Sequence, residues 1–557
     1  MKALLAAALS LSLAACATST NAPAGGSAAQ VDPSRLSEHT RILASDPFGG
    51  RAMGTEGEER TVRYLFEQFT AAGLEPGGEN GGWTQTVPLI RTRVAPQARF
   101  SIAQGGRAVT LRFPEDVYMT TVRPIEAARI AAAPMVFVGY GVSAPERGWD
   151  DFRGADLRGK VAVFLVNDPD FEAAVGEPAH DRFGGQAMTY YGRWSYKFEE
   201  AARRGAVAAL VVHETEGAGY GWNVVQSPGG ENYNIVLPEG AQQPVLLQGW
   251  IQRPAAEALF RRAGLDFERV RREARSGSFR PVDLRATFSA EATVELARIQ
   301  SRNVIGKLTG HARPNESVMF AGHWDSFGSG PPDAQGRRIR PGAVDDAIGI
   351  AGLIELGRVF AAGPRPERTM VFAAWTAEER GLLGAEHYSQ NPLFPLETTA
   401  ANLTMDVLQT AGAARDVVLI GRGQSEMEDM MAEAARAQGR TVTPESHPER
   451  GLFFRADHFA LARRGVPPLL IMALAGGNDL VQGGREAGER WVSDYTTNCY
   501  HQPCDAWSAN WDLAGAVQDV NLIRDIGWRL ANSRAWPAWR EGSEFAAIRA
   551  RTAAARR

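Results

Sequence analysis

The feature that most constrains this chain is an alternation of short apolar runs and helical patterns between residues 296 and 533. The runs ESVMFAGH, TMVFAAW and NLTMDV have the length of strands, whereas AIGIAGLIELGRVFAAG has the length and pattern of a helix. Continuous apolar runs of this kind are typical of parallel strands that are covered on both faces. The pattern therefore predicts an α/β fold with a mixed, largely parallel sheet flanked by helices.

The length of the chain and a change of texture near residue 126 predict more than one domain. The 557 residues exceed the roughly 250–300 at which a single hydrophobic core stops growing. Between residues 126 and 290, short β-rich runs separated by Gly, Pro and Asp indicate a smaller β-rich domain inserted into a larger one. The expected division is a signal peptide at 1–15, a tether at 16–33, the first part of the larger domain at 34–125, the insertion at 126–290, and the main part of the larger domain at 291–557.

The N-terminal segment resembles an export signal. The apolar run after Met1-Lys2 is too short to cross a bilayer, and Leu13 to Cys16 resembles the lipobox of bacterial lipoproteins, in which the cysteine is lipidated. An ordinary secretory signal is the alternative. No later stretch approaches ~20 uninterrupted apolar residues. We therefore expect an exported lipoprotein that faces the periplasm and contacts a bacterial membrane only through Cys16.

The charge balance and the cysteine content limit the partners of the chain. Its 60 Lys and Arg and 64 Asp and Glu give a net charge of −4, so there is no basic excess to neutralise the phosphates of a nucleic acid. If Cys16 carries lipid, Cys499 and Cys504 remain. They either form a disulfide, which an exported protein permits, or stay as free thiols.

Polar residues suited to bind metal follow several of the predicted strands. His323 and Asp325 follow one apolar run, Glu378 and Glu379 follow another, and Asp406 follows a third. Asp345 and Asp346 precede a helix, and His501 lies in a loop. In a doubly wound sheet such positions can converge on one crevice. Imidazole and carboxylate are good zinc ligands, and two metal ions about 3.5–4 Å apart need a bridging carboxylate.

The order of these motifs resembles that of the co-catalytic dizinc exopeptidases, the family of bacterial leucyl aminopeptidases and glutamate carboxypeptidase. The motifs are GHWDS, PGAVDDAIG, WTAEERGLLGAEHY, MDV and YHQPCD. The resemblance covers nearly the whole mature chain. Residues 34–90 resemble the opening helices of the family, and the β-rich insertion resembles a protease-associated domain.

The resemblance implies two zinc ions and a role for each site residue. His323 and Asp406 would complete one zinc site, Glu379 and His501 the other, and Asp345 would bridge them and be followed by a cis peptide bond. Asp346 would be a neighbour and not a ligand. The expected catalytic residues are Glu378 as general base and acid, Asp325 as the acceptor that orients the ring of His323, and Tyr500 as a hydrogen-bond donor to the oxyanion. His458 would serve the structure or support the ligands.

The resemblance therefore favours a zinc-dependent aminopeptidase that acts on peptide substrates. A carboxypeptidase of the same family stays open, as does a glutaminyl cyclase-like enzyme with one zinc ion, and a receptor-like relative without activity is a third class. The complete ligand set disfavours the last two. The loop from residue 329 to 342, with Arg337, Arg338 and Arg340, either binds a substrate carboxylate or is solvated. Residue preference and oligomeric state are not predicted.

Overall fold

The structure is a computed structural model that describes residues 30–556. The expected signal peptide, Cys16 and most of the expected tether lie outside the described residues, so the lipid anchor and the localisation stay predictions. Among residues 30–556, none of the helices combines the length and the apolar character needed to cross a membrane.

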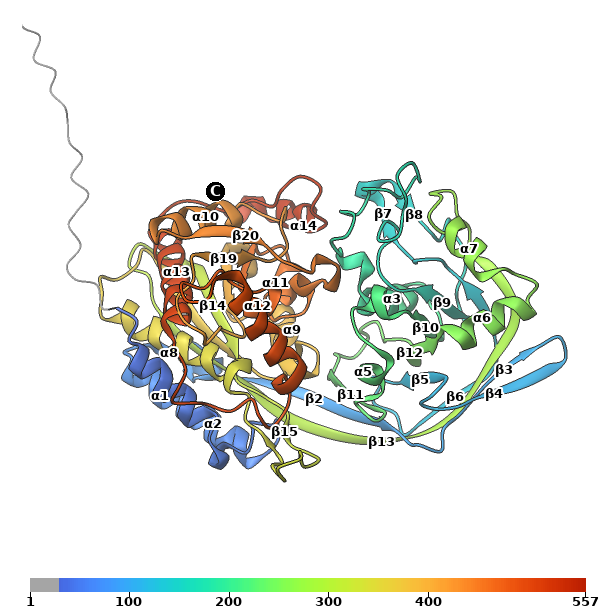
Figure 1. The fold of residues 1–557 in the computed structure, drawn as a ribbon, viewed down its shortest axis with the longest axis horizontal. Coiled ribbons are helices and arrows are strands. Elements are labelled where there is room, and N and C mark those ends of the chain that lie inside the picture. Colours follow the sequence, from blue (N-terminus) through green and yellow to red (C-terminus); the bar gives the residue numbers. More distant parts are fainter. Residues whose placement is uncertain (1–29, 557) are drawn as a thin grey trace, which may run out of the picture.

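One long strand, β13 (Val282–Leu308), runs through both halves of the molecule (Figure 1). Its second half pairs antiparallel with β17 (Arg368–Trp375) and with β2 (Thr84–Val94). Its first half pairs antiparallel with β6 (Ala127–Phe137) and β3 (Arg99–Gln104). The strand therefore joins two sheets, and each sheet forms the centre of one lobe.

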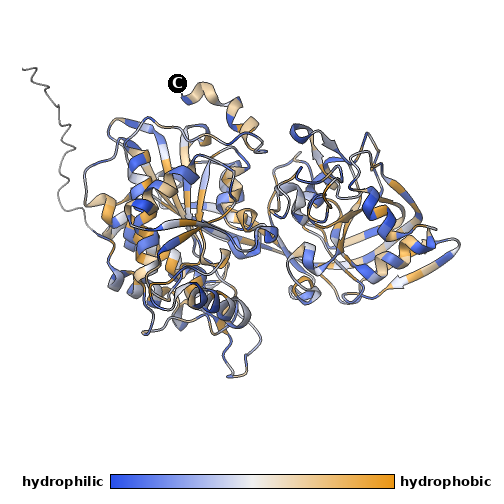
Figure 2. Ribbon diagram, turned by 45° about the horizontal axis from the view of Figure 1, so that its top comes forward, coloured by the Kyte–Doolittle hydropathy of each residue, from blue (hydrophilic) through white to orange (hydrophobic). Residues whose placement is uncertain are grey.

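The main lobe contains a parallel sheet whose order is β21-β18-β14-β17, with β13 antiparallel at the end of this series. The parallel strands are β14 (Arg313–His323), β17, β18 (Thr399–Met405) and β21 (Pro468–Ile471). Apolar residues concentrate on these central strands (Figure 2). The prediction of a largely parallel, mixed sheet flanked by helices is confirmed.

Helices cover both faces of this sheet. One face packs against α1 (Pro33–Leu43), α2 (Glu56–Ala71), α8 (Ile348–Ala361) and α13 (Ala514–Ala531). The other face packs against α9 (Leu383–Gln390) and α11 (His458–Ala462). Val318 and Phe320 of β14 belong to the first core, whereas Met319 and Ala321 belong to the second, because successive strand side chains point to opposite faces.

The second lobe has its own mixed sheet. β6, β9 (Val161–Leu165), β10 (Ala208–His213) and β12 (Leu247–Gln252) are parallel, and β5 (Val117–Thr120) is antiparallel to β12. The hairpin of β3 and β4 (Arg107–Leu111) also pairs with β13 in this sheet. Strands within residues 99–120 thus already belong to the second sheet, although the insertion was expected to begin at residue 126. The division into domains stays a prediction, since β13 belongs to both sheets.

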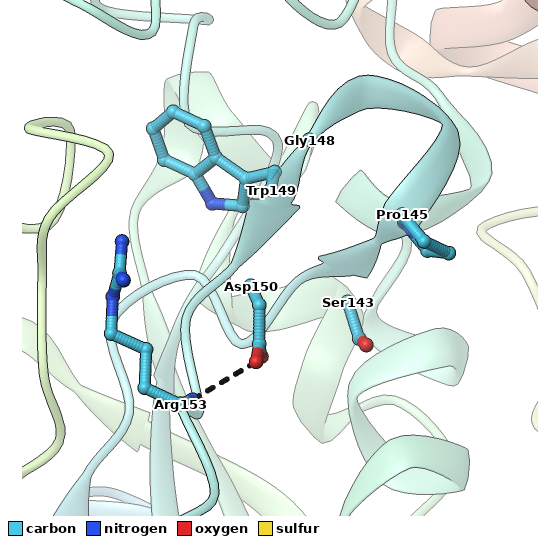
Figure 3. Close-up of a pocket in the computed structure, with 6 residues that line it drawn as sticks. All are labelled: Ser143, Pro145, Gly148, Trp149, Asp150 and Arg153. Atoms are coloured by element: carbon cyan, nitrogen blue, oxygen red, sulfur yellow. Dashed lines mark hydrogen bonds between the residues drawn. The ribbon is translucent and has the colours of Figure 1, made fainter.

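An open pocket of about 450 Å³ lies in the second lobe (Figure 3). Its lining includes Trp149, Asp150 and Arg153, and the carboxylate of Asp150 accepts the backbone N–H groups of Phe152 and Arg153. The pocket contains none of the candidate site residues, so it is separate from the strand ends of the main lobe.

Arg51 connects the N-terminal segment to the strand ends. Its side chain is 1% exposed and donates hydrogen bonds to the carbonyls of Leu43, Trp324, Pro341 and Gly342, at distances of 2.5–3.0 Å. Two of the segments that it holds lead to candidate metal ligands, because His323 precedes Trp324 and Asp345 lies three residues after Gly342. One guanidinium therefore fixes the positions of α1 and of both segments.

We predict that Arg51→Met destabilises the protein by about 4 kcal/mol, because four buried carbonyls each lose a partner at about 1 kcal/mol. Thermal unfolding measures the change. Arg41→Met is the matched control, since Arg41 makes only an exposed ion pair with Glu38, worth about 0–1 kcal/mol. Equal melting temperatures for the two variants would contradict the role of Arg51.

Candidate metal centre

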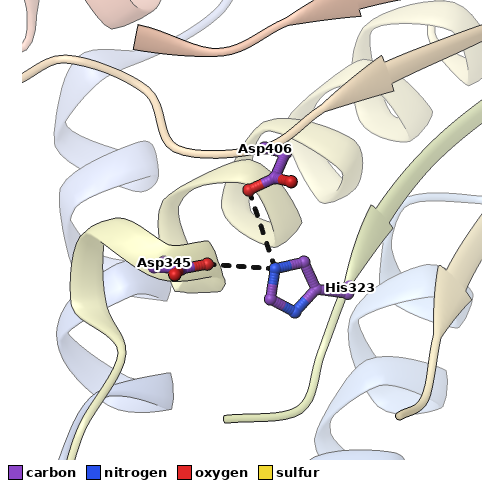
Figure 4. A group of neighbouring side chains, drawn as sticks. All are labelled: His323, Asp345 and Asp406. Carbon is purple, nitrogen blue, oxygen red and sulfur yellow. Dashed lines mark hydrogen bonds and ion pairs between the residues drawn. The ribbon is translucent and has the colours of Figure 1, made fainter. Parts of the chain in front are cut away.

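The first candidate metal group forms where two neighbouring parallel strands end. β14 ends at His323 and β18 ends just before Asp406, and the two strands pair with each other. Asp345 approaches from the segment before α8 (Figure 4). His323 Nε2 lies 3.1 Å from Asp345 Oδ1 and 3.7 Å from Asp406 Oδ1, and all three side chains are buried.

The second group shares Asp345 with the first. His501 Nε2 lies 3.2 Å from Asp345 Oδ2 and 3.2 Å from Glu379 Oε2. Within each group, the three candidate ligand atoms lie within 4.8 Å of one another. Asp345 thus directs one carboxylate oxygen to each group. This is the arrangement that a carboxylate bridging two metal ions requires.

The chemistry of these side chains fits zinc. Glu379 Oε1 and His501 Nε2 are buried, and neither makes a hydrogen bond within residues 30–556, although His501 Nε2 lies 3.2 Å from carboxylate oxygens of Asp345 and Glu379. Burial raises the pKa of Glu379 to about 7, although the charge of His501 opposes this shift. A buried carboxylate is costly unless a proton or a cation neutralises it. The five side chains therefore offer nitrogen and oxygen donors, of the kind that zinc prefers, to two positions that share Asp345.

Glu378 lies beside the first group. Its carboxylate is 4.0 Å from His323 Nε2, and its backbone N–H donates to Asp325 Oδ1 at 3.0 Å. Burial raises the pKa of Glu378 well above its ordinary value. His323 Nδ1 lies 3.2 Å from the backbone oxygen of Asp325 and 3.7 Å from its carboxylate. Asp325 therefore contacts both His323 and Glu378, and its carboxylate fixes the backbone that carries Glu378.

Asp346 supports the backbone around the ligands. Its carboxylate accepts the N–H groups of His323, Gly349 and Val407 at 3.1–3.3 Å. Asp346 is absent from both candidate metal groups of the described chain, in agreement with the expectation that it is a neighbour. The peptide bond between Asp345 and Asp346 is cis, as the family resemblance implied.

Tyr500 stacks on a candidate ligand. The rings of Tyr500 and His501 have centroids 3.6 Å apart, in a loop that the disulfide between Cys499 and Cys504 closes. The choice between a disulfide and free thiols is thus decided in favour of the disulfide. Burial and the nearby charge of Asp345 raise the pKa of the Tyr500 phenol well above its usual value. The phenol therefore stays protonated and can donate a hydrogen bond.

His458 lies in the core, and Asp457 lies near the ligands. Among the described residues, neither ring nitrogen of His458 has a hydrogen-bond partner, and the ring packs 5.0 Å from that of Phe453. Burial lowers the pKa of His458 to about 3, so its ring is neutral. Burial raises the pKa of Asp457 well above its ordinary value, and the acids of the site add to the shift. Sequence reasoning gave a role to His458 and none to Asp457 beside it.

Comparison with known proteins connects this geometry to a family. Residues 303–523 match the family model described as Peptidase family M28, and this span includes all eight candidate site residues. The match assigns residues 303–523 to peptidase family M28.

Curated relatives match this chain over short segments. A "Probable zinc metalloprotease" of Pyrenophora teres f. teres is 40% identical over 110 residues, which are 20% of this chain and 23% of that protein. "Aminopeptidase NAALADL1" of Mus musculus is 33% identical over 138 residues, 24% of this chain and 16% of that protein. The alignments thus span about a quarter or less of these relatives.

A solved structure, "Aminopeptidase from Aneurinibacillus sp. strain AM-1", is 20% identical to this chain. The comparison has a TM-score of 0.49 and covers 90% of this chain and 95% of that one.

Asp505 is a supporting residue of the M28 centre that sequence reasoning missed. Its carboxylate accepts the backbone N–H groups of Val344 and Asp345 at 2.8 and 3.2 Å and the hydroxyl of Tyr495 at 2.9 Å. Burial raises its pKa to about 7. Asp505 is the last residue of the YHQPCD motif, and this position is the sequence feature that could have identified it as part of the site. Asp505 holds the segment that presents Asp345 to both groups.

We predict that Asp505→Ala lowers stability by about 3 kcal/mol, because three buried donors lose their acceptor at about 1 kcal/mol each. The rise in melting temperature on adding zinc should also shrink, since a looser Asp345 binds metal less tightly. Thermal unfolding with zinc and with chelator measures both effects. Asp512→Ala is the control, because Asp512 is exposed and caps a single N–H, that of Ala514. An unchanged zinc-dependent rise in Asp505→Ala would refute this role.

Proposed function

We propose that this chain is a zinc-dependent exopeptidase that uses two zinc ions to hydrolyse the N-terminal bond of peptides. The observation that carries the proposal is the shared position of Asp345, whose two oxygens face two separate groups of ligands. The printed names of the relatives, a zinc metalloprotease and an aminopeptidase, support the same metal and reaction.

Each ligand has a defined task in this proposal. His323 and Asp406 would hold one zinc ion, Glu379 and His501 would hold the second, and Asp345 would bind both. Zinc ions bound there would polarise the substrate carbonyl and lower the pKa of water at the site. The hydrogen bond from the Glu378 N–H to Asp325 keeps the Glu378 side chain beside the first group.

Glu378 moves the proton in the reaction. Its carboxylate takes a proton from the attacking water and passes it to the nitrogen of the leaving amine. The phenol of Tyr500, which burial keeps protonated, donates a hydrogen bond to the oxygen of the attacked carbonyl as negative charge develops there.

Two other activities are open to the same residues. A carboxypeptidase would use the same metal ligands and the same proton transfer, and would differ only in which end of the peptide is held. A cyclase-like enzyme with one zinc ion would leave one group without metal. The second group disfavours that alternative, because two of its buried atoms, Glu379 Oε1 and His501 Nε2, make no hydrogen bond in the described chain and are suited to a second metal ion.

We predict that Glu378→Gln keeps both zinc ions and reduces turnover by roughly 10²–10⁴-fold, because the amide can neither take up nor deliver the proton. Metal analysis of the purified variant and peptide hydrolysis measure the two quantities. Turnover near that of the unmodified protein would contradict the role of Glu378. Loss of zinc would instead make this residue a ligand.

The function itself is tested with short peptides whose ends are free or blocked. Mass spectrometry of the products, with zinc or with a chelator, is expected to show residues removed one by one from free N-termini, only with zinc. Removal from the C-terminus would replace the aminopeptidase by a carboxypeptidase. Loss of ammonia from N-terminal glutamine would favour the cyclase, and retention of activity in chelator would overturn the zinc mechanism.

A further inference from the structure

The imidazole of His501 belongs to a set of stacked side chains that continues away from the ligands. The ring of Phe327 lies 4.3 Å from that of His501, between centroids. The guanidinium of Arg380 lies over the ring of Phe327 at 4.9 Å and over the ring of Tyr233 at 5.0 Å. Tyr233 belongs to β11 (Glu231–Ile235), so residues distant in the sequence place Arg380 beside the metal centre.

A second guanidinium approaches His501 from a short ribbon. The strands β15 (Gly328–Ser329) and β16 (Ile339–Arg340) pair, with Gly328 opposite Arg340. Arg340 Nε donates to the backbone oxygen of His501 at 3.1 Å. Since Phe327 directly precedes β15, this ribbon brings both the ring of Phe327 and the charge of Arg340 to the same loop.

Neither guanidinium is neutralised by the described part of the chain. Between residues 30 and 556, no carboxylate pairs with Arg340 or Arg380, and the side chain of Arg380 donates no hydrogen bond. Arg337, in the same loop as Arg340, does pair with Asp333 at 2.7 Å. The loop arginines thus differ: Arg337 is satisfied and partly exposed, whereas Arg340 turns toward His501.

The contacts of Arg380 with two aromatic rings leave its guanidinium N–H donors without a hydrogen-bond acceptor among residues 30–556. Aromatic rings occupy the faces of a guanidinium, while its N–H donors lie in the plane and match the two oxygens of a carboxylate. Holding the side chain between such rings also reduces the conformational entropy that binding would cost. An arginine arranged in this way is suited to bind a planar anion.

We infer that Arg340 and Arg380 bind a carboxylate of the peptide substrate next to His501. This inference rests on the proposed exopeptidase function and adds a specificity determinant to it. The carboxylate comes either from an acidic side chain or from the free C-terminus of a short peptide, because both present the same planar group. The two guanidiniums also offset the excess of acids at the metal centre, which would otherwise repel such a substrate.

The test compares zinc-loaded Arg380→Met and Arg340→Met with the unmodified protein. Methionine keeps the length of the side chain and removes the charge. Arg337→Met is the matched control, because its ion pair with Asp333 lies outside the proposed contact. Three peptides share one scissile bond: a neutral peptide with an amidated end, the same peptide with a free C-terminus, and an amidated peptide with Glu in place of Gln.

We predict that the unmodified protein prefers a carboxylate-bearing peptide at least tenfold in kcat/KM over the neutral one. Arg380→Met and Arg340→Met should reduce that ratio at least fivefold, whereas Arg337→Met should retain it. The peptide that shows the preference identifies the source of the carboxylate. Equal losses on all three peptides, or no preference in the unmodified protein, would overturn the inference.

A binding measurement separates failure of this inference from failure of the proposed function. If the unmodified protein cleaves no peptide, the proposed function fails, but calorimetry with glutarate and butyrate still tests the arginines. Glutarate can offer a second carboxylate, whereas butyrate cannot. Tighter binding of glutarate that both methionine variants lose supports the inference, and equal affinities of the two acids overturn it.

Discussion

The burial of negative charge at the ends of the parallel strands is the constraint on which this structure depends. Five acids, Asp345, Asp346, Glu378, Glu379 and Asp406, are buried or nearly so around the imidazoles of His323 and His501. Burial raises the pKa of Asp346 and Glu378 well above ordinary values, which expresses the cost of ionising them there. Divalent cations remove that cost. Metal binding and the ordering of the strand ends are therefore linked energetically.

The supporting residues stabilise backbone groups rather than the ligands' side chains. Asp346 and Asp505 accept N–H groups on the segments that carry His323 and Asp345. Arg51 donates to carbonyls on the same segments, and the charges of Asp505 and Asp325 oppose the lowering of its pKa by burial. The carboxylates of Asp346 and Asp505 thus satisfy backbone N–H groups of these segments, and the guanidinium of Arg51 satisfies their carbonyls. Since ligand positions must be reproduced to within a fraction of an ångström, a rigid backbone is the condition for a usable metal centre.

The expectation that the candidate ligands meet at one edge of the sheet rested on the common edge of parallel strands and on the order of the motifs, and the structure brings these residues together in two groups. The contacts of Arg51 could not be predicted, since its acceptors at Trp324 and Gly342 are more than 270 positions away. The glycines on either side of Arg51 indicate only a turn. The sharing of β13 by two sheets was missed for a similar reason: a strand pattern does not specify its partners. The β3–β4 hairpin could have been predicted from the sequence, because Gly-Gly is typical of a two-residue hairpin turn. Gly105 and Gly106 both have positive φ in that turn.

The path of β2 and β13 explains how the second lobe can influence substrate choice. β11, which follows six strands of the second sheet in the chain, returns to pair with β2 next to the main sheet. This return brings Tyr233 over Arg380, one residue after Glu379. The parallel strand ends supply Glu378 and the candidate ligands His323, Glu379 and Asp406, while a residue beyond them contacts Arg380. The proposed hydrolysis and the proposed recognition of a carboxylate therefore depend on different parts of the chain, which meet at His501.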